Sequence, residues 1–198
     1  MKSNLILYNG PTSPFGRKTK IISLIREIEL EEKIINVYQS DFLDKNNPSR
    51  KIPTLIGNNF TIIDSDNICL YFDSISNKKT IFPQNEYWQI MTNTSIANDL
   101  MDTILSRFME ISRKDHEKSE DNIKKLEIRA LRIINWLEKN INFFHNEKLT
   151  MDKIAIACAL EYTMFRFTNK WVEDNKNLDQ WLKNFKNNSF MKLTEPKI

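Results

Sequence analysis

The spacing of hydrophobic and polar positions differs between the two parts of the 198-residue chain. Up to residue 76, short apolar runs typical of buried strands are mixed with the three- and four-residue spacing of amphipathic helices. Beyond residue 86 only the helical spacing remains. The pattern therefore predicts an α/β domain at residues 1–77, a linker, and an all-helical domain at residues 86–198.

The α/β domain is predicted to begin with strand, helix and strand. Residues 5–8 form a short apolar run, and Ser13 followed by Pro14 opens a helix whose apolar stripe extends to about residue 29. Ser is a preferred helix cap because its hydroxyl accepts an otherwise unpaired amide, and Pro is favoured at the first helical position. A second strand is expected at residues 34–38.

A hairpin and a second helix are predicted to complete this domain. Apolar runs at residues 54–56 and 60–63 flank the turn at residues 57–59, which is a hairpin signal. The second helix is expected to begin near Asp64 and Ser65. The order is thus strand–helix–strand, then strand–strand–helix.

The second domain shows helical spacing of apolar residues throughout. Helices are predicted at residues 86–114, 119–144, 151–170 and 178–187.

Charge and cysteine usage narrow the classes of function. The 29 Lys and Arg residues against 26 Asp and Glu residues give a net charge of +3, too balanced for a protein dedicated to binding nucleic acid. Cys69 and Cys158 each lie inside an apolar segment and outside any Cys-x-x-Cys pair. We therefore expect two buried, reduced thiols, no metal or dithiol site, and a reducing, cytoplasmic location.

No segment has the length of a membrane anchor or of a signal-peptide core. The apolar run at residues 5–8 is too short and leads directly into a turn, and the longest small and apolar run covers residues 154–160. The sequence therefore predicts a soluble protein with no membrane partner.

Several motifs occur in an order that resembles the cytosolic glutathione S-transferases. The matching segments are Thr12-Ser13-Pro14-Phe15-Gly16-Arg17-Lys18, Arg50-Lys51-Ile52-Pro53-Thr54-Leu55, Asp64-Ser65-Asp66-Asn67-Ile68 and Ile154-Ala155-Ile156-Ala157-Cys158-Ala159-Leu160. The tail from Ser189 to Pro196 resembles the bacterial YibF-type branch. The resemblance implies a thioredoxin-like domain joined to a helical bundle, glutathione as co-substrate, and a homodimer. Tyr87 and Trp88 are candidate interface aromatics.

Ser13 has two interpretations, a plain helix cap or the group that activates the thiol of glutathione. The resemblance places the activating residue here, with Thr12 as the alternative hydroxyl. A hydroxyl aimed at the sulfur favours the thiolate by hydrogen bonding, and the positive end of the following helix adds to this effect. A Ser in place of Cys argues against thiol–disulfide chemistry.

The resemblance also implies binding residues for glutathione. A cis peptide bond before Pro53 is expected to leave the backbone of Ile52 facing the ligand, where it could pair with the cysteinyl part as a short extra strand. Lys51 could reach the glycyl carboxylate. Asp64 and Ser65, otherwise a simple capping pair, would hold the ammonium and carboxylate of the γ-glutamyl end.

The second substrate is expected to be a hydrophobic electrophile in a pocket between the domains. Its candidate lining residues, for each of which core packing is the alternative, are Phe15, Met101, Leu105, Phe108, Tyr162 and Phe165. Arg17 and Lys18 are expected on the solvated face of the first helix, with added positive potential near the ligand as the alternative.

The function implied is conjugation of glutathione to a hydrophobic electrophile. A glutathione-binding or scaffold protein with little turnover is one alternative, and a glutathione-dependent isomerase or dehalogenase is another. In the second domain, Thr150 is expected to cap a core helix, with Lys153 at the position where the family pattern has Asp and with Asp152 one place early.

Overall fold

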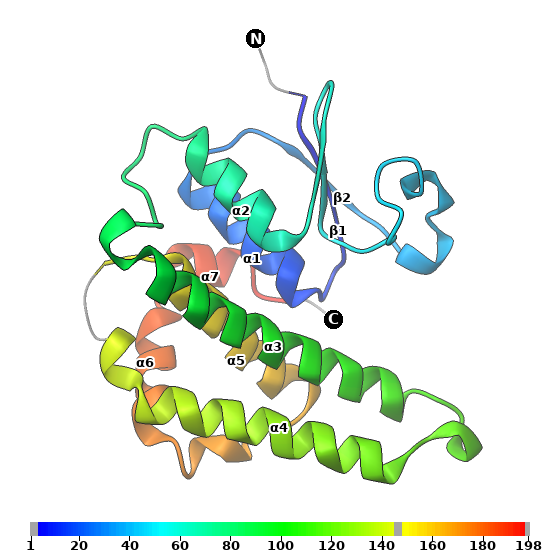
Figure 1. Ribbon diagram of the computed structural model, residues 1–198, viewed down its shortest axis with the longest axis vertical. Helices are drawn as coiled ribbons and strands as arrows, with labels where there is room; N and C mark the ends of the chain where they lie inside the picture. Colours follow the sequence, from blue (N-terminus) through cyan, green and yellow to red (C-terminus); the bar gives the residue numbers. More distant parts are fainter. Residues whose placement is uncertain (1–3, 145–147, 197–198) are drawn as a thin grey trace. The chain divides into compact units, whose positions relative to one another are not determined.

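The computed structural model describes residues 4–144 and 148–196. It divides into two compact units (Figure 1). The first contains the chain up to Ile81 together with the residues from Asn188 onward, and the second is Phe82–Asn187. The C-terminal segment therefore packs with the α/β unit, although it follows the helical one in sequence.

The first unit is built on a four-stranded sheet with the order β2-β1-β3-β4. β1 (Ile6–Asn9) lies at the centre and pairs in parallel with β2 (Glu31–Ile34). On its other side β1 pairs antiparallel with β3 (Thr54–Ile56), which pairs antiparallel with β4 (Thr61–Ile63). The predicted hairpin is confirmed.

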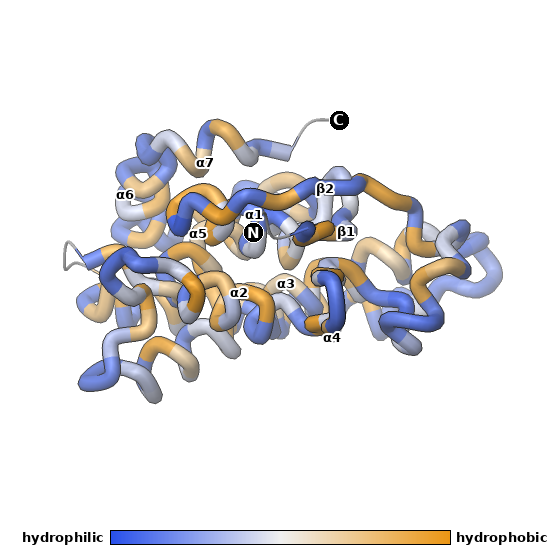
Figure 2. Tube along the Cα trace, turned by 90° about the horizontal axis from the view of Figure 1, so that it is seen from above, coloured by the Kyte–Doolittle hydropathy of each residue, from blue (hydrophilic) through white to orange (hydrophobic). Residues whose placement is uncertain are grey.

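The second strand begins earlier than the predicted range 34–38. β2 is the edge strand, and Figure 2 shows that it is mostly hydrophilic. Its side chains are largely exposed, so the strand is held by backbone pairing to β1 and not by apolar side chains. The apolar run after it turns away, since the Asn36 side chain accepts from the amide of Tyr38 and starts a 3₁₀ turn. The predicted range was placed on the apolar run, so it missed the charged residues with which this edge strand begins.

Two helices pack side by side in the first unit, α1 (Pro14–Ile25) and α2 (Ser65–Ser74) (Figure 1). α1 ends before the predicted residue 29, because Glu27 adopts a φ of 56° and the chain reverses there, with the Ile28 amide donating to the Ser23 carbonyl at 2.9 Å. The core of the unit contains the fully buried side chains Leu7, Ile21, Ile22, Leu55, Ile68 and Phe72.

The second unit is helical, as predicted. α3 (Tyr87–Ile111) packs along α4 (Glu120–Lys139) and α5 (Met151–Arg166), and α6 (Lys176–Phe185) contacts α4 and α5. α5 is buried from Met151 to Thr163, consistent with a helix that is hydrophobic on all sides at the centre of a bundle. In the described residues, short 3₁₀ turns lie at Val37–Gln39, Asp41–Leu43, Gln84–Glu86, Asp115–Glu117, Ile141–Phe144 and Lys170–Val172.

A short helix that the sequence did not predict, α7 (Ser189–Leu193), packs against α1. Arg17 of α1 donates from Nη2 to the Met191 carbonyl at 3.1 Å and from Nε to the Thr194 hydroxyl at 3.3 Å. The placement of Arg17 and Lys18 on a solvated face is therefore wrong: Arg17 is 7% exposed and Lys18 is fully buried. Both side chains lie where a second element covers α1.

Candidate functional site

The N-terminus of α1 presents a hydroxyl at a helix start. Ser13 is the cap residue, and its Oγ accepts from the amide of Gly16 at 3.1 Å. The cap uses a lone pair of the oxygen, so the hydroxyl hydrogen can donate to another group. The capping interpretation is confirmed, and it is compatible with a role for the same hydroxyl in binding an anion at the positive end of α1.

Asn9 fixes the loop that leads to Ser13. Its buried side chain accepts from the amide of Gly10 at 2.8 Å and donates to Glu32 Oε1 at 2.9 Å. Gly16 is required for this arrangement, because a Cβ at this position would lie 1.5 Å from Asn9 Oδ1. Sequence reasoning missed Asn9, although the polar residue at the end of a buried strand was a usable signal.

The structure places Ile52 beside the same loop. A Cβ built on Gly10 would lie 2.5 Å from Ile52 Cδ1 and 3.7 Å from Ser13 Cβ, so Ser13 and Ile52 border one glycine. The peptide bond before Pro53 is cis, as expected. The amide and carbonyl of Ile52 make no hydrogen bond to any described residue, which leaves both available to a ligand backbone.

Asn47 fixes the backbone on either side of Ile52. This side chain is 1% exposed and donates to the Lys51 carbonyl at 2.9 Å and to Thr54 Oγ1 at 2.8 Å. Its Oδ1 accepts from both the amide and the hydroxyl of Ser49. Asn47 is a second site-building residue that the sequence reasoning missed. Lys51 itself is exposed.

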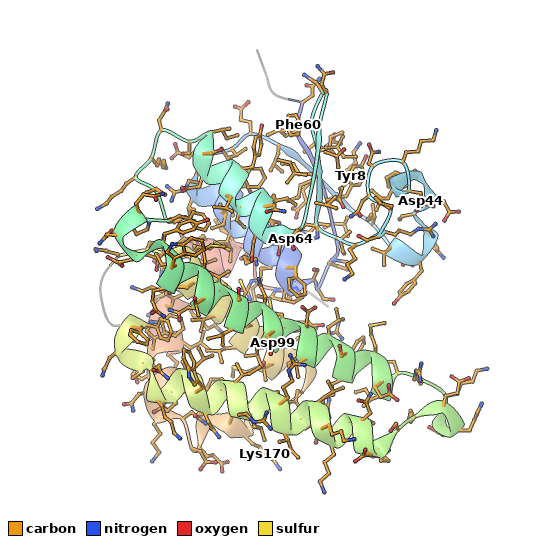
Figure 3. All side chains as sticks on the ribbon, viewed as in Figure 1. Tyr8, Asp44, Phe60, Asp64, Asp99 and Lys170 are labelled. Carbon is orange, nitrogen blue, oxygen red and sulfur yellow. The ribbon has the colours of Figure 1, made fainter. Side chains whose placement is uncertain are left out.

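Asp64 and Ser65 lie where β4 leads into α2, as Figure 3 shows for Asp64. Asp64 has a φ of 73°, unusual for a residue with a side chain, and its Oδ1 accepts from the amides of Asp66 and Asn67 at 2.9 and 3.3 Å. Ser65 is 5% exposed, and its hydroxyl makes no hydrogen bond within the described part of the chain. A nearly buried hydroxyl at a helix start is suited to a ligand carboxylate.

A buried ion pair joins the two helix starts. Lys18 of α1, fully buried, pairs with Asp66 in the first turn of α2. The Lys18 ammonium also lies 5.9 Å from the centre of the Phe15 ring. The sequence elements that carry Ser13 and Ser65 are thereby held together within one unit.

A cavity of about 280 Å³ opens beside Ser13 in the same unit. Its lining residues are Asn9, Gly10, Pro11, Thr12, Ser13, Arg17, Lys20, Glu32, Ile34, Leu193, Thr194, Glu195 and Pro196. Thr12, the alternative hydroxyl, lies in this lining. None of the six residues predicted for the second-substrate pocket does.

Of the residues predicted to line the second-substrate pocket, some are buried in the core and others contact a guanidinium. Met101 is fully buried and Tyr162 is 5% exposed, as expected for core packing. Phe108 and Phe165 instead have the Arg166 guanidinium over their rings, at 4.3 and 4.4 Å from the ring centres. Burial raises the pKa of the Tyr162 phenol, and the charge of Arg166 partly opposes this rise.

Leu105 and Phe15 are partly exposed. Whether the predicted set lines one pocket stays a prediction.

Metal-ligand chemistry and membrane insertion find no support in the described ranges. Among residues 4–144 and 148–196, no three His, Cys, Asp or Glu side chains gather in a way that could hold a metal ion. In the same ranges, no helix combines the length and apolar character needed to cross a membrane. Cys69 and Cys158 are buried thiols.

Comparison with known proteins gives a family match for the first unit. Residues 7–80 match the family model described as the glutathione S-transferase N-terminal domain. Among curated proteins, glutathione S-transferase D7 of Drosophila melanogaster is 27% identical over 191 residues, covering 91% of this chain and 84% of the relative. Glutathione S-transferase U22 of Arabidopsis thaliana is 27% identical over 173 residues, covering 86% and 78%.

Solved structures extend the likeness to both units. A glutathione S-transferase from Methylobacillus flagellatus with GSH bound superimposes with a TM-score of 0.92 at 21% identity, over 98% of this chain and all of that one. A glutathione transferase family member from Pseudomonas fluorescens with bound glutathione gives 0.90 at 24% identity, over 98% and 100%. The chain therefore has the glutathione S-transferase fold.

Proposed function

We propose that this protein is a glutathione transferase that joins the sulfur of reduced glutathione to an electrophile. The family match and the named relatives support this function. The observation that carries it is that Ser13, at the start of α1, and Ile52, whose backbone makes no hydrogen bond within the described residues, both border Gly10. The Ser13 hydroxyl can donate to a thiolate, and the Ile52 amide and carbonyl can pair with the peptide backbone that carries this thiolate.

Ser13 is the residue to which we assign thiol activation. Glutathione is mostly a thiol at neutral pH, whereas the thiolate is the nucleophile. The Gly16 amide occupies one lone pair of the Ser13 oxygen, which leaves the hydroxyl hydrogen to donate to the sulfur. The α1 dipole adds to the stabilisation of the anion, and each unit of thiol pKa depression corresponds to about 1.4 kcal/mol. Thr12 is the alternative donor.

The remaining residues are assigned to the ends of the tripeptide. The Ile52 amide and carbonyl pair with its cysteinyl residue, and Lys51 approaches its glycyl carboxylate. Ser65 binds the γ-glutamyl carboxylate at the start of α2. Asp64 caps α2 through Oδ1, so Oδ2 is the oxygen that we assign to the γ-glutamyl ammonium.

Partners and location complete the proposal. We assign the protein to the YibF-type bacterial branch on its C-terminal segment, and to the cytoplasm on its two buried thiols. We further propose a homodimer in which Tyr87 and the 80% exposed Trp88 contribute to the interface. The electrophile is taken to be small and largely apolar.

A conjugation assay tests this function directly. The purified chain is mixed with glutathione and chlorodinitrobenzene, and thioether formation is followed beyond the spontaneous rate. We expect saturable turnover, lowered at least tenfold in Ser13→Ala and unchanged in Ser95→Ala, a matched substitution on the exposed side of α3. Retention on immobilised glutathione without turnover would identify a binding protein instead, and absence of both would contradict the proposal.

A further inference from the structure

The start of α2, to which the γ-glutamyl end of glutathione is assigned, carries two negative charges. Asp64 caps the helix (Figure 3) and Asp66 lies in its first turn, so a carboxylate stands on each side of Ser65 in the sequence. One carboxylate is favourable at a helix N-terminus, but neighbouring like charges repel one another. A ligand carboxylate that approaches Ser65 therefore meets two charges of its own sign.

The protein itself uses part of the binding capacity of this helix start. Asp64 Oδ1 accepts from the amides of Asp66 and Asn67 at 2.9 and 3.3 Å. The hydroxyl of Ser65, a residue that is 5% exposed, makes no hydrogen bond within the described part of the chain. Because the dipole of α2 is already partly compensated by Asp64, binding of a ligand carboxylate at Ser65 depends on the balance of the surrounding charges.

Lys18 of α1 supplies the balancing positive charge. Its ammonium is fully buried and pairs with the Asp66 carboxylate, which is 18% exposed. Both residues belong to the first unit. An apolar side chain of similar volume in place of a buried charge is often neutral or favourable for stability, so stability alone does not explain a lysine at this position. Asp66 keeps contact with water, so removal of Lys18 would leave a negative charge next to Ser65 in the sequence.

We propose that Lys18 determines recognition of the α-carboxylate of the γ-glutamyl group, because it cancels the charge of Asp66 and so lets that carboxylate bind Ser65. This proposal rests on the proposed transferase function and adds to it a specificity-determining residue. Asp64 then meets the ligand ammonium, and Ser65 meets the ligand carboxylate without an uncompensated neighbour. Lys18 is a positioning residue, since it acts through Asp66.

A purely structural role of the ion pair would have a different consequence. If the pair only packed α1 against α2, its loss would disturb the whole site and would weaken every ligand of that site alike. A charge-balancing role affects only ligands that carry the carboxylate, because a neutral or cationic group gains nothing from cancelling Asp66. The two roles can therefore be separated by changing the ligand.

Three ligands make this separation. Glutathione has both charges at its γ-glutamyl end, glutaryl-Cys-Gly keeps the carboxylate and lacks the ammonium, and 4-aminobutyryl-Cys-Gly keeps the ammonium and lacks the carboxylate. Calorimetric titration of the full chain gives the Kd of each ligand. In Lys18→Met we expect the Kd of the two ligands with the carboxylate to rise about tenfold or more, and that of the third to change less than about twofold.

A double variant without either charge tests whether Lys18 acts through Asp66. Lys18→Met combined with Asp66→Asn should bring the Kd of glutathione back to within about threefold of the unaltered protein. The matched control is Lys153→Met, which removes a buried ammonium in the other unit and should leave all three Kd values unchanged. In the conjugation assay, Lys18→Met should raise the KM for glutathione and leave kcat within about threefold.

Equal weakening of all three ligands in Lys18→Met would identify a packing role and overturn the proposal. An unchanged Kd for glutathione in that variant would overturn it as well, and so would a double variant that binds glutathione as poorly as Lys18→Met does. Failure of the unaltered protein to bind any of the three ligands would instead contradict the transferase function itself.

Discussion

At the scale of single residues, the first unit depends on polar side chains that are almost completely buried. Asn9, Arg17, Lys18 and Asn47 are each less than 10% exposed. The first three contact elements distant in sequence, and Asn47 bonds within its own loop and to the start of β3. Buried polar groups are costly unless they are hydrogen-bonded. The contacts of Asn9, Lys18 and Asn47 fix the loops that lead to Ser13 and Ile52 and the start of α2, whereas those of Arg17 hold α7 against α1.

The ion pair between Lys18 and Asp66 should be asymmetric in its effect on stability. Asp66→Asn leaves a buried ammonium without its carboxylate and should cost about 3–5 kcal/mol in the free energy of unfolding. Lys18→Met replaces the ammonium by an apolar chain and should cost less, because Asp66 is still 18% exposed to water. Urea unfolding of both variants and of the double variant measures the coupling. A coupling below about 0.5 kcal/mol would contradict this account.

Ser65 should matter for binding of glutathione and not for folding. Ser65→Ala removes a hydroxyl that has no partner in the described chain, so the free energy of unfolding should change little. Loss of a hydrogen bond to a ligand carboxylate, about 1.5–3 kcal/mol, should weaken glutathione binding roughly tenfold or more, as measured by calorimetric titration. The control is Ser74→Ala at the other end of α2, and equal affinity in both variants would remove Ser65 from the site.

Apart from what the resemblance implied, the sequence pattern marks the residues of the candidate site that act locally. Ser13 and Asp64 cap the helices that follow them, and this is visible in their neighbours along the chain. Asn9, Asn47 and Arg17 act through partners far away in sequence or through loop carbonyls, so no local pattern marks them. Arg17 was misplaced because α7, which covers it, was itself not predicted.

At the scale of elements, periodicity predicted all the helices of the second unit but not their ends. Residues 141–144 form a 3₁₀ turn after α4, and α5 ends at Arg166 and not at residue 170. α7 has five residues, too few for an apolar period to be recognised. β2 was displaced because the charged edge strand carries little of the hydrophobic signal on which the prediction relied.

At the start of α5, the carboxylate of Asp152 takes the place of the usual side-chain capping bond. Thr150 is the cap residue, yet its side chain makes no capping bond and instead contacts Asp152 at 2.6 Å. The Asp152 carboxylate also accepts from the Lys153 amide at 3.0 Å and from Asn93 Nδ2 at 2.9 Å. One buried carboxylate thus ties the start of α5 to α3, and the Thr150 hydroxyl donates to this carboxylate.

Lys153 makes the stability of this junction depend on pH. Burial lowers the pKa of the Lys153 ammonium below its ordinary value, although the charges of Asp152 and Glu86 oppose the shift. Because the folded state releases this proton first, the contribution to the free energy of unfolding should rise with pH between the lowered pKa and about 10.5. Lys153→Met should abolish that rise, as seen by urea unfolding at neutral and alkaline pH. Parallel pH profiles would refute this assignment.

At the scale of the whole molecule, the division into two units was predictable because strand signals stop before residue 86. The return of the residues from Asn188 to the first unit was not predictable, since it depends on contacts between α1 and α7. This return brings residues 193–196 to the cavity beside Ser13. One wall of this cavity is therefore formed by a segment that the hydrophobic pattern did not assign to the first unit.

The proposed homodimer gives a test at this scale. Trp88 is 80% exposed and meets Tyr87 edge to face at 5.3 Å, so a charge at this position should disrupt an interface that buries it. Light scattering during gel filtration should give twice the chain mass for the unaltered protein and the chain mass for Trp88→Glu. Met109→Glu, on the same helix and 51% exposed, serves as the control. A monomeric unaltered protein would exclude this interface.

The proposed function depends on the first unit keeping the sulfur of glutathione ionised through Ser13. Ultraviolet absorbance of the bound thiolate, titrated against pH, measures its pKa in the unaltered protein and in Ser13→Ala. The account predicts a pKa well below that of free glutathione, and a rise of one unit or more in the variant while binding is largely kept. The same low pKa in both proteins would contradict it.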